Sequence, residues 1–88
     1  MKVEFLKGFE KDLLRTQDKR LAKMILHSIH LFENAKCLEE IPNIKKLKGH
    51  STAYRYRKGK YRIGFYIEDN TIIFAAFAPR SKIYQKFP

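Results

Sequence analysis

The stretch from residue 53 to residue 78 reads AYRYRKGKYRIGFYIEDNTIIFAAFA, and it decides the fold. Polar and apolar side chains alternate over residues 53–58 and again over 61–68, with the period of two that is typical of half-buried strands. Residues 71–78 are apolar on both faces, which suits a strand inside a sheet. The stretch therefore predicts three consecutive strands.

Short turns separate these strands. Lys58-Gly59 is expected to form the first turn, where glycine adopts a positive φ without steric cost, and Asp69-Asn70 the second. Strands joined by turns of two residues must run antiparallel.

The N-terminal half has the periodicity of helices. Residues 2–6 alternate as a short strand, and residues 9–15 have apolar side chains four apart, as in a short helix. A longer helix is predicted over 18–34, with Asp18 as its N-cap. Residues 35–46 show little periodicity and are read as a loop, and 81–87 as a tail of one or two helical turns.

The apolar stripe of the longer helix must lie on an apolar surface. Its members are Leu21, Ile25, Ile29 and Phe32, widened by Ala22, Met24 and Leu26. We expect an α+β fold in one domain over residues 1–88. Its small antiparallel sheet carries two N-terminal helices on one face, in the order β-α-α-β-β-β.

Charge is distributed very unevenly along the chain of 88 residues, whose formal net charge is +10. Residues 1–44 hold 8 Lys and Arg against 7 Asp and Glu, whereas residues 45–88 hold 11 against 2. A surface of this kind attracts polyanions, so nucleic acid is the leading class of partner.

Other classes of protein are disfavoured. A lone cysteine, Cys37, cannot form an internal disulfide. The longest apolar run, residues 72–78, is far shorter than the roughly 20 residues of a membrane span. Acidic residues near the N-terminus do not fit a signal peptide. We therefore expect a cytoplasmic protein without a membrane partner.

Cationic and aromatic side chains interleave in the segment 54–62, YRYRKGKYR. Arginine binds phosphate oxygens in a bidentate manner, and aromatic rings stack on bases. Strand alternation places Arg55 and Arg57 on one face, and hairpin pairing would bring Arg62 to the same face. This pattern favours a surface for single-stranded RNA.

The segment from Leu47 to Tyr84 resembles the RelE/ParE toxin superfamily. The resemblance rests on the basic pair Arg55 and Arg57, on the step Gly59-Lys60-Tyr61-Arg62, and on the ending Arg80-x-x-x-Tyr84. The expected order of elements also agrees with that superfamily.

This resemblance implies an endoribonuclease that cleaves messenger RNA, usually on the ribosome, and an acidic antitoxin that neutralises it. The RNA 2′-hydroxyl attacks the adjacent phosphate, and neither a metal nor a small-molecule cofactor is implied. The protein must align the 2′-oxygen, stabilise the added charge on phosphorus and move two protons.

The resemblance also assigns roles to residues. Arg55, Arg57 and Arg62 would bind phosphate and stabilise charge, Arg80 would act at the transition state or near the leaving group, and Tyr84 would stack on a base or orient the nucleophile. Further RNA contacts are expected from the cations and rings around them, namely Lys45, Lys46, Lys48, Lys58, Tyr54 and Tyr56.

The general base stays open among His50, Lys58, Lys60 and Tyr84. Some catalytic members have lysines where this chain has Arg55 and Arg57, and arginine does not release a proton in practice. Lys60 is preferred as a catalytic residue because neighbouring cations favour the neutral form of a lysine.

Two other functions remain open from the sequence. One is inhibition of DNA gyrase, as in the ParE branch, and the other is RNA binding without cleavage. His27 and His30 are three residues apart on the longer helix, but no third ligand lies at a supporting spacing, so a metal site is not expected.

Overall fold

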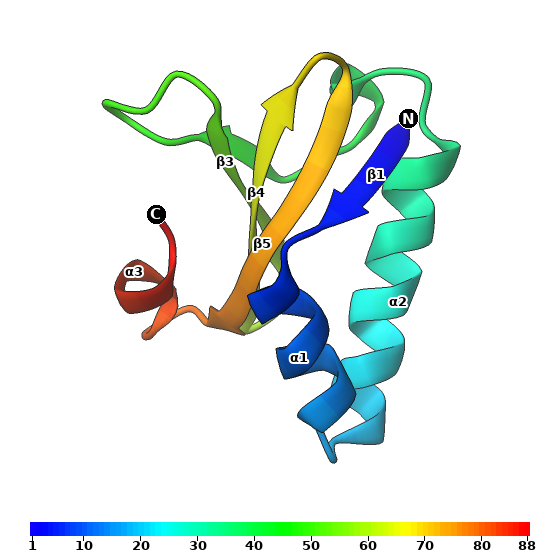
Figure 1. Cartoon of the computed structure of the whole chain (residues 1–88), viewed down its shortest axis with the longest axis vertical. Coiled ribbons are helices and arrows are strands. Elements are labelled where there is room, and N and C mark those ends of the chain that lie inside the picture. The colour runs from blue at the N-terminus through cyan, green and yellow to red at the C-terminus, as the bar shows by residue number, and fades with distance from the viewer.

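The computed structural model describes residues 1–88 and has the predicted elements in the predicted order (Figure 1). In chain order they are β1 (Lys2–Phe5), α1 (Lys7–Arg15), α2 (Lys19–Asn34), the 3-10 turn η1 (Leu38–Glu40), β2 (Ile44–Lys46), β3 (Ala53–Lys58), β4 (Tyr61–Glu68), β5 (Thr71–Pro79) and α3 (Ile83–Lys86). The three predicted C-terminal strands are confirmed, and the α+β class with them.

The five strands form one sheet in the order β1-β5-β4-β3-β2. The two hairpins formed by β3, β4 and β5 are antiparallel, as expected. The sheet is nevertheless mixed, because β1 pairs with β5 in parallel. Helices separate β1 from the other strands along the chain, and only a long connection of this kind allows parallel pairing.

A short edge strand lies where the sequence predicted only loop. Residues 35–46 include η1 and β2, and β2 pairs antiparallel with β3, placing Lys45 opposite Arg55. A strand of three residues is too short to show a period of two. The loop prediction for these residues is wrong in that respect.

The turns explain why the hairpins close where they do. Gly59 has a φ of 58°, as predicted, but the turn residues are Gly59 and Lys60, because Lys58 still pairs with Tyr61. In the next turn Asp69 and Asn70 both have positive φ, at 50° and 59°. Two consecutive residues in this region make the turn whose twist matches antiparallel strands.

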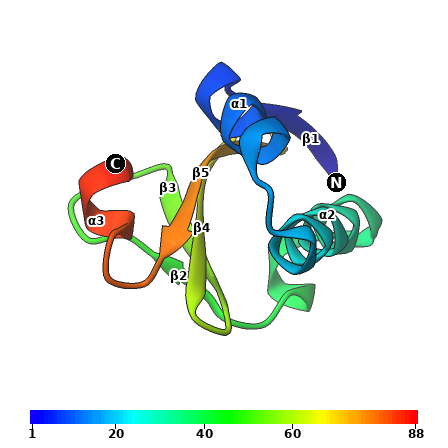
Figure 2. The ribbon, with the colours of Figure 1, turned by 90° about the horizontal axis from the view of Figure 1, so that it is seen from below.

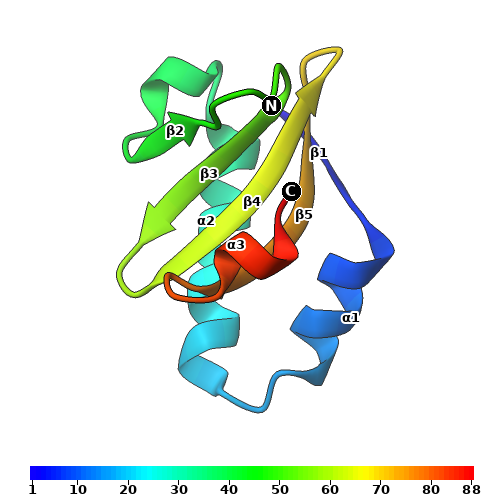
Figure 3. The same ribbon diagram turned by 90° about the vertical axis from the view of Figure 1, so that its left-hand side faces the viewer.

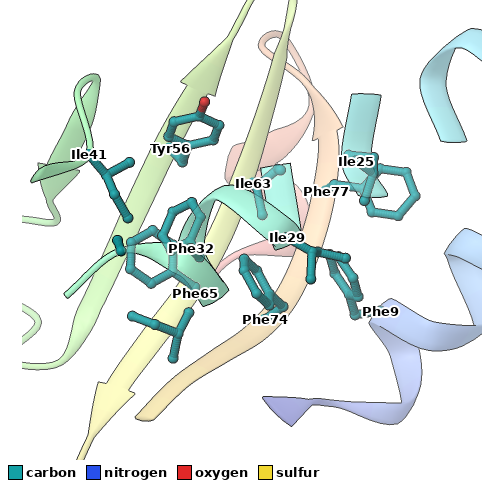
Figure 4. Close-up of a cluster of buried hydrophobic side chains, with 12 residues drawn as sticks. Phe9, Ile25, Ile29, Phe32, Ile41, Tyr56, Ile63, Phe65, Phe74 and Phe77 are labelled. Atoms are coloured by element: carbon teal, nitrogen blue, oxygen red, sulfur yellow. The ribbon is translucent and has the colours of Figure 1, made fainter. Parts of the chain in front are cut away.

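Helix α2 covers one face of the sheet through Ile25, Ile29 and Phe32 of the predicted stripe, whereas Leu26, which was expected to widen the stripe, is 47% exposed. The Asp18 carboxylate accepts hydrogen bonds from the backbone N–H groups of Arg20 and Leu21, at 3.0 and 3.1 Å, which confirms the N-cap. Phe32 is fully buried, with ring centroids 5.1 to 5.3 Å from three rings of the sheet (Figure 4). Burial of each such side chain contributes about 1.5–3 kcal/mol. No helix has the length and apolar character that crossing a bilayer requires.

The sheet has different neighbours on its two faces. Helices α1 and α2 lie on one face, and the short α3 lies on the other (Figures 2 and 3). The second face carries a smaller apolar cluster, made of Leu47, Ala53, Ala76, Ala78, Ile83 and Phe87.

A β-bulge in β5 changes which of its side chains face the helices α1 and α2 and which face α3. Gly64 pairs with Ala76 but Phe65 pairs with Phe74, so that Ala75 is the extra residue. The bulge shifts the alternation by one. As a result Phe77 joins the core under the helices, while small alanines on the other face leave room for α3.

Candidate functional site

Cationic side chains meet on the α3 face of the sheet because of the hairpin register. Arg57 lies directly opposite Arg62 on β4, and Arg55 lies directly opposite Lys45 on β2. Residues directly opposite each other in an antiparallel pair project from the same face. The register therefore gathers four cations from three strands, as the alternation predicted for the three arginines.

These side chains line an open cleft of about 460 Å³, within the roughly 300–1,000 Å³ of typical ligand sites. Its lining is Asn43, Ile44, Lys45, Arg55, Arg57, Arg62, Arg80 and Tyr84. Five of the eight residues are cations, and none is a carboxylate. The cleft is consequently built for an anion.

Hydrogen bonds hold two of the arginines in place. The Arg57 Nη2 donates to Asn43 Oδ1 at 2.9 Å, and the Arg57 backbone N–H donates to the Asn43 carbonyl at 3.0 Å. The Arg62 Nη1 donates to the backbone carbonyls of Gly59 and Tyr61, at 3.0 and 2.9 Å. Each guanidinium keeps further donors free, because a guanidinium has five.

Repulsion among the arginines affects the pKa of Arg62. Burial lowers the pKa of its guanidinium, and the charges of Arg80, Arg57 and Arg55 lower it further. Like charges disfavour the charged form of a group. A bound phosphate would relieve this repulsion.

Tyr84 reaches the cleft from α3. The Arg55 guanidinium carbon lies 4.7 Å from the centre of its ring, in the range of a cation–π contact. Hydrogen bonding by Arg55 lowers the pKa of the Tyr84 hydroxyl, and the charges of Arg55, Arg80 and Lys45 act in the same direction. The side chain is 70% exposed, so the hydroxyl is accessible to a ligand.

The other predicted cations lie outside the cleft. Lys60 is on the β3–β4 turn and lines an adjoining hollow that also includes Arg62, Arg80 and Tyr84. Lys46 and Lys58 follow the cleft residues Lys45 and Arg57 on their strands, so they project from the opposite face of the sheet. Lys48 lies in the turn before β3. All four are exposed at the surface.

Two predicted RNA-binding rings lie on the opposite face of the sheet. Tyr56 is 4% exposed and contacts Phe32 edge to face, while Tyr54 stacks on Phe65 at 5.6 Å. Tyr56 belongs to the core under the helices, and the partly buried Tyr54 packs against that core. Their alternation with Arg55 and Arg57 turns the rings away from the cleft, which corrects the prediction that they stack on bases there.

The histidines take no part in the cleft. His50 is exposed in the loop before β3 and does not line it. His30 is paired with Glu33 at 3.0 Å, and His27 is exposed on α2. No three His, Cys, Asp or Glu side chains are grouped so as to hold a metal ion.

Sequence reasoning missed Asn43 and Ile44 as cleft residues. Asn43 follows Pro42 and has a φ of 67°, a conformation that asparagine tolerates better than most residues. A Pro-Asn pair is a turn signal, but it does not show that the side chain reaches an arginine 14 residues later.

Known proteins are similar to this chain in sequence over its full length and in fold over more than nine-tenths of it. No protein-family model matches it. Over 89 aligned residues and the full length of both chains, it is 40% identical to Toxin RelE3 of Methanocaldococcus jannaschii.

Two solved structures are also similar. The RelB-RelE antitoxin-toxin complex from Methanococcus jannaschii matches with a TM-score of 0.77 and 38% identity, over 97% of this chain and 99% of that chain. The RelE-RelB complex from Pyrococcus horikoshii OT3 matches with a TM-score of 0.70 and 25% identity, over 92% of this chain and 96% of that chain. Full-length identity of 40% to a RelE toxin shows that this chain belongs to the RelE family of toxins.

Proposed function

We propose that the chain is the toxin of a toxin–antitoxin pair and cleaves messenger RNA on the ribosome at the arginine cleft. The observation that carries this proposal is the group of five cations without any carboxylate, with one accessible tyrosine hydroxyl among them. The family relation supports the same conclusion.

The cleft suits attack by the RNA 2′-oxygen on the adjacent phosphate. A phosphodiester carries one negative charge, and the phosphorane formed by this attack carries a second. Guanidinium donors fixed in advance stabilise the added charge without having to reorganise. Arg57 and Arg62 have this preorganisation through their backbone and asparagine contacts, and Arg55 and Arg80 complete the cluster.

Tyr84 is the best placed of the four candidate bases, because it is the only one of them that lines the cleft. A lowered pKa increases the fraction of phenolate that can accept the 2′-proton. Lys60, in the adjoining hollow with Arg62, Arg80 and Tyr84, is the second candidate base.

An experiment with translating ribosomes tests the proposal. The purified protein is added, and messenger ends are mapped by primer extension. We expect discrete cuts within codons in the ribosomal A site, and a fall of about 10²–10³-fold in rate for Arg62→Ala and Arg80→Ala. Lys23→Ala removes an exposed cation on α2, outside the cleft, and is the matched control.

Chemistry and target are tested separately. A message with a single 2′-deoxy nucleotide at the mapped cut should resist cleavage there, and cuts that persist would refute attack by the 2′-oxygen. Intact messenger together with inhibited DNA supercoiling would indicate gyrase as the target. Salt-sensitive RNA binding without cuts would indicate an inactive RNA-binding protein.

We also propose an acidic antitoxin as partner, since the relatives of known structure are RelB-RelE complexes and the cleft is strongly cationic. A negatively charged segment that orders over the cleft would block phosphate binding. Co-expression with a small acidic protein encoded next to this chain should yield a complex whose affinity falls with salt. A complex that left cleavage unchanged would contradict this role.

A further inference from the structure

The position of Tyr84 depends on a helix too short to be stable by itself. Helix α3 has only four residues, Ile83 to Lys86. A single helical turn is unfavourable in water because its nucleation cost is not recovered. Side chains of α3 must therefore fix its place on the sheet.

Two buried side chains flank the exposed Tyr84. Ile83 is fully buried and Phe87 is 4% exposed, whereas Tyr84 between them is 70% exposed. Both buried side chains belong to the apolar cluster on this face. A pair between Lys86 and Asp12, at 2.7 Å, also reaches α3, but partly exposed pairs contribute little.

Phe87 packs at a place on β4 that only glycine permits. A methyl group added to Gly64 would overlap the Phe87 ring, while the other three glycines have nothing near that position. The Phe87 ring also contacts Tyr66, with centroids 5.0 Å apart. Gly64 lies directly opposite Arg55, so the Phe87 ring is anchored next to the arginine that Tyr84 contacts.

We propose that Phe87 is a positioning residue: its packing on Gly64 holds α3 so that the Tyr84 ring lies over Arg55 in the cleft. The positioning itself follows from these contacts, and its effect on RNA cleavage rests on the proposed function. Figure 3 shows α3 across β4 and β5, on the face away from α2.

Titration of Tyr84 tests the position without any RNA. Tyrosine labelled with ¹³C at Cζ reports each of the five hydroxyls by NMR, and Tyr84→Phe identifies the resonance. The charges of Arg55, Arg80 and Lys45 lower the pKa of Tyr84, and Arg62 also interacts with Tyr84 electrostatically. In Phe87→Ala the pKa of Tyr84 should rise toward the ordinary value of about 10, because the ring leaves Arg55.

Further variants separate positioning from loss of stability. Gly64→Ala should raise the pKa of Tyr84 as well, because its methyl group displaces the Phe87 ring. In the double variant Gly64→Ala/Phe87→Ala the methyl group occupies space that the ring has left. This double variant should be more stable than Phe87→Ala, and the pKa of Tyr84 should still be raised in it. Phe87→Leu keeps an apolar anchor and should restore the lowered pKa.

A matched control removes a ring from the other face. Phe5 on β1 stacks on Phe9 at 5.8 Å, under the helices. Phe5→Ala should reduce stability and leave the pKa of Tyr84 lowered. A lowered pKa in Phe87→Ala or in the double variant would overturn the proposal.

The cleavage assay gives the catalytic consequence. Misplacement of a reacting group by about 1 Å can cost about 10²-fold, so kcat of the double variant should fall about 10- to 100-fold. The KM should change less than about threefold, since the strand arginines still bind phosphate. A kcat equal to that of the wild type would overturn the role in catalysis. A raised pKa together with wild-type protein that cuts no RNA would refute the proposed function and support the positioning.

Discussion

Arg57→Gln is expected to make the protein more stable while it abolishes cleavage. Arg57 and Arg62 face each other across β3 and β4, and the charge of Arg57 lowers the pKa of Arg62. Like charges directly opposite each other in a sheet destabilise it. Glutamine removes the charge and keeps an amide that can donate to Asn43, the partner of Arg57.

The magnitude follows from the pair and its exposure. Cross-strand pairs of charges contribute roughly 0.2–1 kcal/mol, and Arg57 is exposed, so removal of its charge should add about 0.5 kcal/mol to the free energy of unfolding at low salt. Arg57→Glu replaces repulsion by attraction and should add about 1 kcal/mol. For a domain of this size, these gains correspond to increases in Tm of about 2–4 °C and about 4–8 °C.

Urea unfolding followed by circular dichroism measures the effect at low salt and in 1 M NaCl. The screening length falls to about 3 Å at 1 M, so both gains should largely disappear there. Lys58→Gln lowers the net charge equally, next to Arg57 on the same strand, and should show little gain. Variants of Arg57 that are no more stable than wild type at low salt, or whose gain survives 1 M NaCl, would refute the repulsion argument.

Three further outcomes are expected. Asn43→Ala should lower the free energy of unfolding by about 1 kcal/mol in urea unfolding, because alanine is strained in the left-handed backbone conformation of this position, while Asn43→Gly should not. Both variants should cleave more slowly in primer extension, because the Arg57 side chain loses its acceptor. Tyr84 has a lowered pKa in the folded state, so its ionisation contributes stability that is complete above the unfolded pKa, near 10, and lost as pH falls through the folded pKa. The stability of wild type relative to Tyr84→Phe should therefore rise with pH up to about 10, and an unchanged difference would contradict the Arg55 contact. Inorganic phosphate at 100 mM, against chloride of equal ionic strength, should raise Tm; a dissociation constant of about 10 mM would give about 1.4 kcal/mol, and Arg62→Ala should lose most of this gain.

Elements whose regular pattern extends over six or more residues could be predicted from the sequence. The strands over 53–58 and 61–68, and the N-cap Asp18 of α2, agree with the structure because local alternation and capping chemistry determine them. The strand of three residues, the bulge at Ala75 and the parallel pairing of β1 could not be predicted. They depend on contacts between segments far apart in the sequence, and no local pattern reports these.

The cleft was predictable only in part, for a related reason. Alternation and turn length together place Arg55, Arg57 and Arg62 on one face. Tyr84 needs an anchored α3, and that anchoring follows from how Phe87 fits on Gly64. A fit of this kind depends on three-dimensional packing and has no signature in spacing.

The same hairpin supplies both the core and the cleft, and this explains how a group of like charges persists in a small domain. Tyr56 lies directly opposite Ile63 in the hairpin, and both side chains project into the core. The next pair along the two strands is Arg57 and Arg62, which project into the cleft. Burial of two large side chains contributes about 3–6 kcal/mol, several times the cost of one like-charge pair. The alternation that gathers the arginines therefore also provides the free energy that holds them together. Any slip of the register by one residue would lose both at once.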